Sequence, residues 1–215
     1  MLENAPQKLI VLGARSQAPV LADWVDELPG YEITHFVENQ DRTRCGGAIL
    51  GRPIIWVDEV RSMVKSHSGF AAFGSPERDG LVKAVAAFGL SFATPVHPSS
   101  VLSQSCTLGE GSIVSPAVVI SAFTSIGRHV LVNRGALIGH NVTVGDYGTI
   151  GPGSNIAGFC EIGPKTYIGM GATILDQVKV GANCVIGAGS VVTRDVPDGQ
   201  TAYGVPARIV SASNT

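Results

Sequence analysis

Residues 125–150 read SIGRHVLVNRGALIGHNVTVGDYGTI, and this stretch is part of a longer run of six-residue units. Every sixth residue from Val96 to Val192 is Val, Ile or Leu. If one residue in three were of these types, chance would give such a run with a probability on the order of 10⁻⁸. The residue two positions before each aliphatic one is small throughout the run. The run is therefore a structural repeat.

The repeat predicts a left-handed parallel β-helix. Two inward positions separated by one outward position are typical of a short strand, because successive side chains point to opposite faces. Three units form one coil of about 18 residues, so we expect five to six coils, each about 4.8 Å high. Glycine often follows the aliphatic residue, as at Gly127, Gly139 and Gly145. A glycine there suits either an unusual turn conformation or a close approach between backbones.

The N-terminal part has the pattern of a small α/β lobe. Apolar runs and helical spacing predict a unit of strand, helix and strand, followed by further short strands and a second helix. The expected strands cover residues 8–12, 32–37, 54–57 and 70–73, and the expected helices cover residues 16–28 and 80–88. We assign residues 1–92 to a lobe with a small Rossmann-like parallel sheet and residues 93–215 to the β-helix with a C-terminal tail.

Composition excludes several classes of protein. The 215 residues carry 15 Lys and Arg against 17 Asp and Glu, a formal net charge of -2, so no excess of cations is available for nucleic acid. No apolar run approaches the roughly 20 residues that cross a bilayer, and the chain starts without a basic and then apolar leader. We expect a soluble, cytoplasmic protein without membrane insertion. Three of the four cysteines, Cys106, Cys160 and Cys184, fall on the small inward position, which predicts reduced core thiols.

The turn after the first strand is a candidate binding site. Residues 13–17 lie where parallel sheets of this kind bind ligands, at the carboxyl ends of the strands. The turn lacks a complete G-x-G-x-x-G pattern, so the sequence does not predict a dinucleotide. A single mononucleotide-type lobe is the better description.

The order of these parts resembles a known family. An α/β lobe precedes the repeat, Val96-His97-Pro98-Ser99 stands at the junction, Asn133-Arg134-Gly135-Ala136 precedes His140, and Gly204-Val205-Pro206-Ala207-Arg208 stands near the end. Together they resemble the bacterial sugar acyltransferases of the sialic-acid O-acetyltransferase type, which include nucleotide-aminosugar N-acetyltransferases. The resemblance covers nearly the whole chain. It implies an acetyl-CoA-dependent transferase for surface glycan synthesis, with a nucleotide-linked amino sugar as acceptor.

The resemblance also implies roles for single residues. It implies a homotrimer, an acetyl-CoA groove between neighbouring β-helices, no metal, and His140 as the general base. The imidazole of His140 fits this role because it stands two residues past the inward Ile138, where it should project outward, and because histidine is the side chain most often used as a general base. The family has an acidic residue after this histidine, whereas this chain has Asn141, and a backbone carbonyl is one possible replacement. The acetyl-CoA groove then involves Thr149, Gly158, Met170 and Ala188, and the nucleotide-sugar site involves Arg15, Ser16, Gln17, Glu38, Asn39 and Gly74.

Alternative readings start from the histidines. Zinc chemistry of the γ-type carbonic anhydrases would need three of them at a subunit interface, but His129 and His140 have different offsets in the repeat and lack a simple ligand spacing. A second alternative is a trimeric scaffold that binds a nucleotide and has no activity. A third is transfer to a sugar hydroxyl instead of an amine. The sequence leaves the nucleotide base, the sugar and the acyl chain length open.

Overall fold

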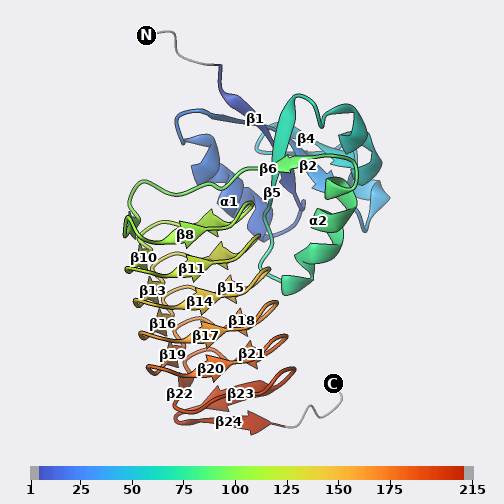
Figure 1. Ribbon diagram of the computed structural model, residues 1–215. Helices are drawn as coiled ribbons and strands as arrows, with labels where there is room; N and C mark the ends of the chain where they lie inside the picture. Colours follow the sequence, from blue (N-terminus) through green and yellow to red (C-terminus); the bar gives the residue numbers. More distant parts are fainter. Residues whose placement is uncertain (1–4, 211–215) are drawn as a thin grey trace. The chain divides into compact units, whose positions relative to one another are not determined.

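The computed structural model describes residues 5–210, and these residues divide into two compact units (Figure 1). Residues 5–74 and 78–95 form the first unit, which we call the lobe. Residues 75–77 and 96–210 form the second, which contains the repeat. Within the described residues, the helices are too short or too polar to span a membrane.

The lobe is built on one six-stranded sheet with the order β3-β4-β2-β1-β5-β6. All neighbouring strands are parallel except β3 and β4. The strands are β1 (Gln7–Leu12), β2 (Tyr31–Glu38), β3 (Ala48–Ile49), β4 (Arg52–Trp56), β5 (His67–Ala71) and β6 (Ser91–Phe92). The helices are α1 (Gln17–Asp26) and α2 (Asp79–Ala86), with 3₁₀ turns at η1 (Arg42–Arg44), η2 (Val57–Ser62) and η3 (Pro76–Arg78). The predicted α/β fold is confirmed.

Burial explains why these segments form the lobe. The central strand β1 buries Leu9 to Leu12 completely, as expected for a strand covered on both faces. Helix α1 buries one face through Ala18, Leu21, Ala22 and Val25. It ends before Pro29, which cannot continue a helix. Periodicity missed β3 and β6 because strands of two residues are too short to show an alternation.

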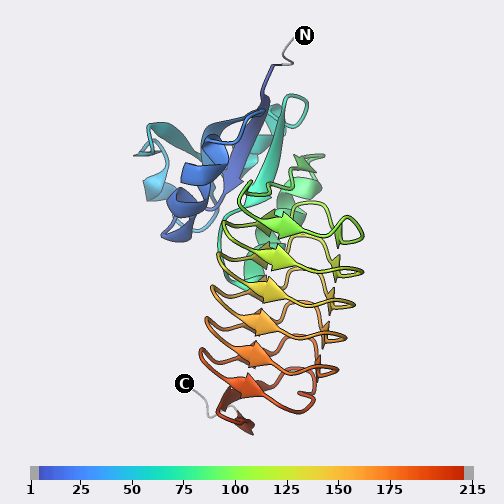
Figure 2. The ribbon, with the colours of Figure 1, turned by 90° about the vertical axis from the view of Figure 1, so that its left-hand side faces the viewer.

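The second unit is the predicted left-handed parallel β-helix. Two-residue strands stack in three sheets, which form its three faces (Figure 2). The β13 face contains β7 (Val101–Leu102), β10 (Val119–Ile120), β13 (Leu137–Ile138), β16 (Asn155–Ile156), β19 (Thr173–Ile174) and β22 (Val191–Val192). The β14 face contains β8 (Thr107–Leu108), β11 (Ser125–Ile126), β14 (Thr143–Val144), β17 (Glu161–Ile162) and β20 (Lys179–Val180). The β15 face begins with β9 (Ile113–Val114), β12 (Leu131–Val132), β15 (Thr149–Ile150), β18 (Tyr167–Ile168) and β21 (Val185–Ile186).

The inward residues fill the β-helix as the repeat predicts. The aliphatic residues from Val114 to Val192 are almost completely buried, and so are the small residues that alternate with them. Buried hydroxyls on the small positions satisfy the backbone. Ser112 Oγ donates to the Gly127 carbonyl at 2.7 Å, and Thr166 Oγ1 donates to the Gly181 carbonyl at 2.6 Å. Each of these bonds joins one coil to the next, which removes the cost of an unpaired buried hydroxyl.

The glycines after the aliphatic residues are needed for close backbone approach. A Cβ at Gly163 would lie 2.4 Å from the Ala182 nitrogen of the next coil. The left-handed conformation occurs two residues later in the turn, for example at Asn141 (φ 56°) and Phe159 (φ 59°). Of the two explanations that the sequence allowed for these glycines, close approach is therefore the one that holds.

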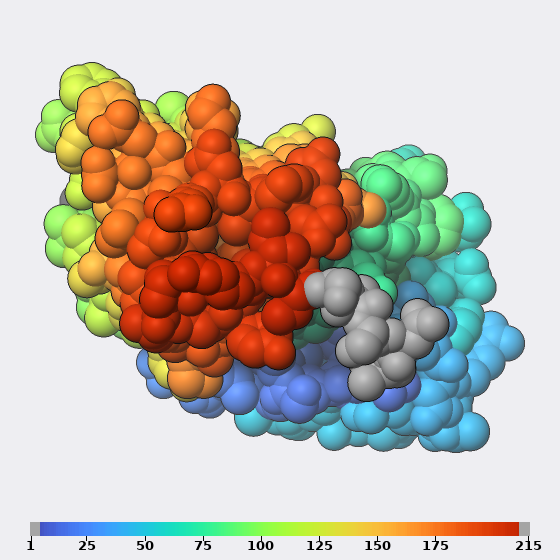
Figure 3. Space-filling view, turned by 90° about the horizontal axis from the view of Figure 1, so that it is seen from below, coloured from blue at the N-terminus to red at the C-terminus, as the bar shows by residue number. Residues whose placement is uncertain are grey.

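A hairpin closes the C-terminal end of the β-helix. Strand β23 (Thr201–Gly204) continues the β15 face beside β21, and β24 (Ala207–Val210) returns antiparallel to it. Figure 3 views this end, and its red C-terminal residues cover much of the last coil. The cysteines Cys45, Cys106, Cys160 and Cys184 are free thiols, with the last two buried. Burial raises the pKa of the Cys160 and Cys184 thiols, as expected for inert core residues.

Candidate active site

His140 projects from the corner that joins the β13 face to the β14 face. We call this edge the His140 corner; it consists of residues 121–124, 139–142, 157–160 and 175–178, stacked on one another. Backbone hydrogen bonds join the turns, from Phe159 N to the His140 carbonyl and from Gln177 N to the Gly158 carbonyl. The ring of His140 is exposed, as its position two residues past Ile138 predicts.

Two neighbours hold the imidazole in one orientation. The Nδ1 atom of His140 lies 3.0 Å from Asn141 Oδ1, close enough for an N–H on Nδ1 to donate to this oxygen. The ring packs edge-on against Phe159, with the ring centroids 5.0 Å apart and the planes at 87°. Asn141 has a left-handed backbone, which asparagine adopts more readily than most residues. A side-chain amide, not a backbone carbonyl, thus occupies the place of the family's acidic residue.

The turn that carries His140 is anchored at both ends by one buried hydroxyl. Thr124 Oγ1 donates to the Gly139 carbonyl at 2.7 Å and accepts from Val142 N at 3.2 Å. Gly158 stands one coil further along the same corner, and a Cβ there would lie 2.9 Å from His140 Nε2. The absence of a side chain at Gly158 therefore leaves room for the imidazole.

The other residues predicted for the acetyl-CoA groove lie elsewhere on the β-helix. Met170 and Ala188 are exposed and stand one coil apart on the corner that leads from the β15 face into the β13 face. Thr149 lies on strand β15 and is buried. Within one chain, the structure therefore brings Gly158 to His140 but places Met170 and Ala188 at the opposite edge of the β13 face.

The lobe has a cavity of about 100 Å³ at the carboxyl ends of β1 and β2. Its lining includes three of the residues predicted for the nucleotide sugar, namely Arg15, Glu38 and Asn39. Gln17 and Gly74, also predicted for this site, lie close to each other, because a Cβ at Gly74 would be 2.7 Å from Gln17 Oε1, but neither lines the cavity. Ser16 is exposed at the start of α1 and does not line the cavity.

Glu38 is the buried charge of this cavity. Its Oε1 accepts hydrogen bonds from Asn39 N and Gln40 N, both at 2.9 Å. Its Oε2 lies 3.5 Å from Arg15 Nε and 3.6 Å from Arg44 Nε, and it accepts no hydrogen bond from the described residues. Burial opposes the charge, but the two N–H donors and Arg15 outweigh it and hold the pKa of Glu38 below its usual value. The free lone pairs of Oε2 can accept a ligand's hydroxyl or N–H.

Sequence reasoning missed Gln40 and Phe73, which line this cavity, and Arg44, which pairs with Glu38. Arg44 also donates to the Ala14 carbonyl, which ties η1 to the turn after β1. The segment 40–44 follows the end of β2, and the carboxyl ends of parallel strands meet at one sheet edge. The polar run after the second expected strand was therefore a usable signal for Gln40 and Arg44, but not for Phe73.

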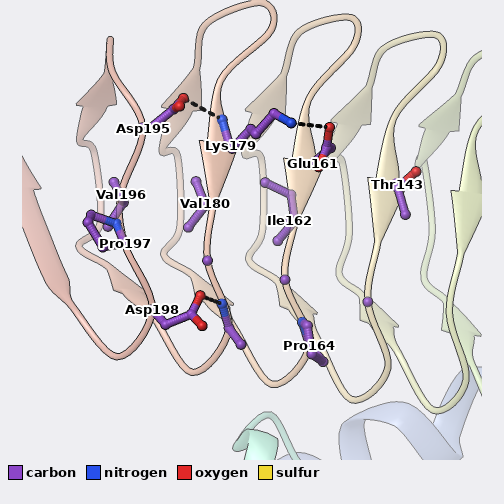
Figure 4. Close-up of a pocket in the computed structure, with 14 residues that line it drawn as sticks. Thr143, Glu161, Ile162, Pro164, Lys179, Val180, Asp195, Val196, Pro197 and Asp198 are labelled. Carbon is purple, nitrogen blue, oxygen red and sulfur yellow. Dashed lines mark hydrogen bonds and ion pairs between the residues drawn. The ribbon is translucent and has the colours of Figure 1, made fainter.

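A separate groove of about 680 Å³ follows the β14 face (Figure 4). Glu161, Lys179 and Asp195 form a row along it, with Lys179 Nζ 2.8 Å from Glu161 Oε1 and Lys179 N donating to Asp195 Oδ1 at 2.8 Å. The bond to Glu161 raises the pKa of Lys179. None of the predicted site residues lines this groove. In residues 5–210, no three His, Cys, Asp or Glu side chains are grouped so that they could hold a metal ion.

Comparisons with known proteins define the class of this fold. Residues 123–158 and 159–194 match the family of bacterial transferase hexapeptide (six repeats) proteins. Perosamine N-acetyltransferase from Caulobacter crescentus, solved as a point mutant with CoA and GDP-perosamine, is 32% identical with a TM-score of 0.88; the match covers 96% of this chain and 98% of that one. No curated protein matches significantly. These matches place the chain in the class of hexapeptide-repeat transferases.

Two further solved structures narrow the class to a family. The acetyltransferase domain of PglB from Neisseria gonorrhoeae, in complex with acetyl coenzyme A, is 30% identical with a TM-score of 0.88; the match covers 96% of this chain and 100% of that one. WeeI from Acinetobacter baumannii is 23% identical with a TM-score of 0.78 and supports the fold; its match covers 95% of this chain and 100% of that one. The chain belongs to the bacterial sugar acyltransferases of the sialic-acid O-acetyltransferase type.

Proposed function

We propose that this protein is an acetyl-CoA-dependent N-acetyltransferase whose acceptor is a nucleotide-linked amino sugar. The observation that carries this proposal is the exposed, oriented imidazole of His140 within a fold that matches two acetyltransferases along almost its full length. One of these relatives was solved with CoA and GDP-perosamine and the other with acetyl coenzyme A. The first is named as an N-acetyltransferase, which favours an amine over a hydroxyl as the acceptor.

In this proposal, His140 is the general base and acts through Nε2. The Asn141 amide oxygen accepts a hydrogen bond from Nδ1–H, which leaves the lone pair on Nε2 free. The acceptor nitrogen attacks the thioester carbonyl and loses a proton to Nε2 while the C–S bond breaks, and CoA leaves as the thiolate. The imidazolium can then return the proton to the thiolate sulfur, so His140 ends in its starting form.

Backbone donors of the facing coil would stabilise the oxyanion. The N–H of Gly158 forms no hydrogen bond with any residue in the range 5–210, and this glycine lies directly next to His140 Nε2. An N–H in this position can donate to the carbonyl oxygen as negative charge develops on it. The chemistry of the step therefore needs only the imidazole and the backbone of the corner.

The lobe cavity is the proposed site for the nucleotide. Glu38 Oε2 is a buried acceptor without a hydrogen bond from the described residues, and Arg15 is half-exposed beside it. A ribose or a base offers donors to the carboxylate, and a diphosphate offers oxygens to the guanidinium. We assign Ser16, Gln17, Asn39 and Gly74 to the rim of this site, which lies at the carboxyl edge of the sheet.

We further propose a homotrimer with the acetyl-CoA groove between neighbouring chains. Gly158 and the pair Met170 and Ala188 lie on different corners, so one copy cannot place all three along one groove. A second copy that packs its Met170 corner next to the His140 corner would complete the groove, with Thr149 on the same copy. Exposed apolar residues along the β13 face and its corner give such a contact an apolar surface: Val101, Val119, Phe123, Leu137, Phe159 and Leu175. Light scattering should then give three times 22.2 kDa.

The experiment that tests the function measures CoA release from acetyl-CoA with a panel of acceptors. The panel contains UDP-, GDP- and dTDP-linked 3-amino and 4-amino sugars, together with their hydroxyl counterparts, and is run with wild type and His140→Ala. Turnover with an amino sugar that falls about 100-fold or more in the variant would support the proposal. Turnover only with hydroxyl sugars would show an O-acetyltransferase, and nucleotide binding without any turnover would show a scaffold.

A cytoplasmic location and a role in surface glycan synthesis complete the proposal. The role is what the family resemblance implies, and the cytoplasm is where we expect the acceptor and the donor to meet. Fractionation of cells that express the tagged protein should recover it in the cytosolic fraction.

A further inference from the structure

Phe159 is an exposed phenyl group beside the proposed base. Its relative exposure is 55%, although an apolar side chain gains free energy when it is buried. Its backbone is left-handed with φ 59°, a conformation in which a bulky side chain is strained. Asn141 takes the same place in the turn one coil earlier, and asparagine adopts this conformation more readily. In a single chain the phenyl group is therefore unfavourable on two counts, which favours a role in binding.

The backbone around Phe159 is held from both neighbouring coils. Phe159 N donates to the His140 carbonyl at 3.0 Å, and the Gly158 carbonyl accepts from Gln177 N at 2.9 Å. The next residue, Cys160, is buried in the core. The phenyl ring itself packs edge-on against the imidazole, with the centroids 5.0 Å apart. The ring therefore starts from a fixed Cα and cannot turn away without losing its contact with His140.

The proposed reaction brings the acyl group to this phenyl ring. The acceptor nitrogen lies within hydrogen-bond reach of His140 Nε2, and the acyl oxygen accepts from the N–H of Gly158. A Cβ on Gly158 would lie 2.9 Å from Nε2 and 3.0 Å from Cε1, so the N–H and the imidazole can act on the same carbonyl group. The methyl group of acetyl is one bond, about 1.5 Å, from the carbonyl carbon. It needs an apolar surface in this corner, and Phe159, the residue after Gly158, supplies one.

We propose that Phe159 limits the length of the transferred acyl group, because the methyl group of acetyl packs on its phenyl ring. The inference rests on the proposed function and restricts its donor to acetyl-CoA over thioesters with longer chains. A longer chain would have to push the phenyl ring away, and the imidazole would lose the ring that it packs against. One methylene in an apolar pocket changes kcat/KM by about 10- to 200-fold. Phe159 is thus a specificity-determining residue for the acyl donor.

Phe123 is a second exposed phenyl group of the His140 corner and provides a matched control. It takes the same place in its turn two coils before Phe159, with φ 58° and a relative exposure of 69%. Its N–H donates to Ser105 Oγ at 3.0 Å. At about 4.8 Å per coil, the two phenylalanines are about 10 Å apart along the axis. Replacement of Phe123 thus removes the same chemical group from the same corner but leaves the surface next to Gly158 intact.

The test measures kcat/KM for acetyl-CoA, propionyl-CoA and butyryl-CoA with the amino sugar that the acceptor panel identifies. Wild type should use butyryl-CoA about 100-fold or more less efficiently than acetyl-CoA, because the chain is two methylenes longer. In Phe159→Ala this ratio should fall about 10-fold or more, through a gain with butyryl-CoA. The variant should keep its turn, because Ala117 adopts the same left-handed backbone in this chain with φ 57°. Phe159→Leu, with a shorter apolar side chain, should accept propionyl-CoA better than wild type does.

Phe123→Ala should keep the wild-type ratio of kcat/KM values for the three donors. A phenyl group that only holds the imidazole, or only packs against a second copy, would on removal lower all three values by the same factor. An unchanged ratio in both Phe159→Ala and Phe159→Leu, or an equal change of the ratio in Phe123→Ala, would therefore overturn the proposal. Failure of the proposed function looks different, because wild type itself would then release CoA from none of the three donors with any acceptor of the panel.

Discussion

Two histidines of the β-helix, His140 and His129, stand at different corners, and their surroundings differ. His140 is exposed, with Gly158 beside its Nε2 and Asn141 at its Nδ1. His129 is 3% exposed, and its ring stacks on Tyr147 with the centroids 5.2 Å apart and the planes at 15°. A Cβ at Gly111 would lie 2.2 Å from His129 Nδ1, so this ring fills the space above a glycine.

The difference shows that the surroundings of an outward residue depend on the residues 18 positions away, one coil before and one coil after it, and not on the six-residue repeat. The residues that stand 18 positions away are Gly111 and Tyr147 for His129, and Ala122 and Gly158 for His140. An aromatic neighbour one coil away gives His129 a stacking partner, whereas a glycine leaves one nitrogen of His140 open to a reactant. The same residue type thus packs at one corner and is available for chemistry at the other.

The largest expected effects come from replacing each of these two histidines by alanine in turn. His140→Ala should lower kcat/KM about 100-fold or more, since it removes the base, and should leave the melting temperature unchanged because the ring is exposed. His129→Ala should do the reverse and lower the free energy of unfolding by about 2–4 kcal/mol through the cavity that it leaves. Kinetics and denaturant unfolding of both variants measure the two effects.

Each variant serves as the control for the other. A loss of stability in His140→Ala as large as that in His129→Ala would mean that both rings are structural. A loss of activity in His129→Ala at unchanged stability would mean that His129, and not His140, is the histidine that takes part in the reaction.

The regular part of the molecule was predictable from the sequence, because each coil repeats the same constraint. Seventeen aliphatic positions define the inward set of the β-helix, from Val96 to Val192. The outward position of His140 follows from its offset, and the structure confirms its exposure. The contact between Nδ1 and the Asn141 amide was not predictable, because it depends on the side-chain torsions of two adjacent residues.

The lobe was less predictable because its cavity is lined by loops whose sequences show no regular spacing of apolar residues. Arg15 follows the end of β1 and Glu38 is the last residue of the adjacent β2, so sheet topology places them together. Arg44 reaches the same carboxylate from η1, a turn whose shape depends on Asp41 accepting from Thr43 N and from its hydroxyl. Such local side-chain to backbone hydrogen bonds determine the path of the loop, and the pattern of apolar residues does not predict them.

The second expected effect concerns Gly158. Gly158→Ala places a methyl group 2.9 Å from His140 Nε2, which forces the ring out of its position. We expect kcat to fall about 10- to 100-fold, the scale of a misplacement by about 1 Å at a reacting group. The same substitution in a His140→Ala background should cost nothing further, because the ring that it displaces is absent. Equal losses in both backgrounds would show that Gly158 acts through the backbone or the donor instead.

Asn141 should give a smaller effect, with a change in pH dependence as its signature. Asn141→Gly keeps the left-handed backbone without strain and removes the acceptor of Nδ1, so we expect kcat to fall about three- to tenfold. Asn141→Asp keeps an acceptor and adds a negative charge, which stabilises the imidazolium and should move the acid limb of the pH–rate profile to higher pH. An Asn141→Asp profile that coincides with that of wild type would remove Asn141 from the mechanism.

The last and smallest expected effect concerns the stability of the lobe, measured without a nucleotide. The pKa of Glu38 is lowered in the folded protein, so its carboxylate stabilises the fold above the pKa of the unfolded chain. This contribution is lost as pH falls through the lowered pKa of the folded state. Glu38→Gln should therefore be less stable than wild type by about 1–2 kcal/mol at pH 7, and the two unfolding curves should converge as the pH is lowered into the acid range. If the difference in unfolding free energy between the two proteins stays constant with pH, Glu38 stabilises the lobe by packing and not through the attraction between its charge and Arg15 and Arg44.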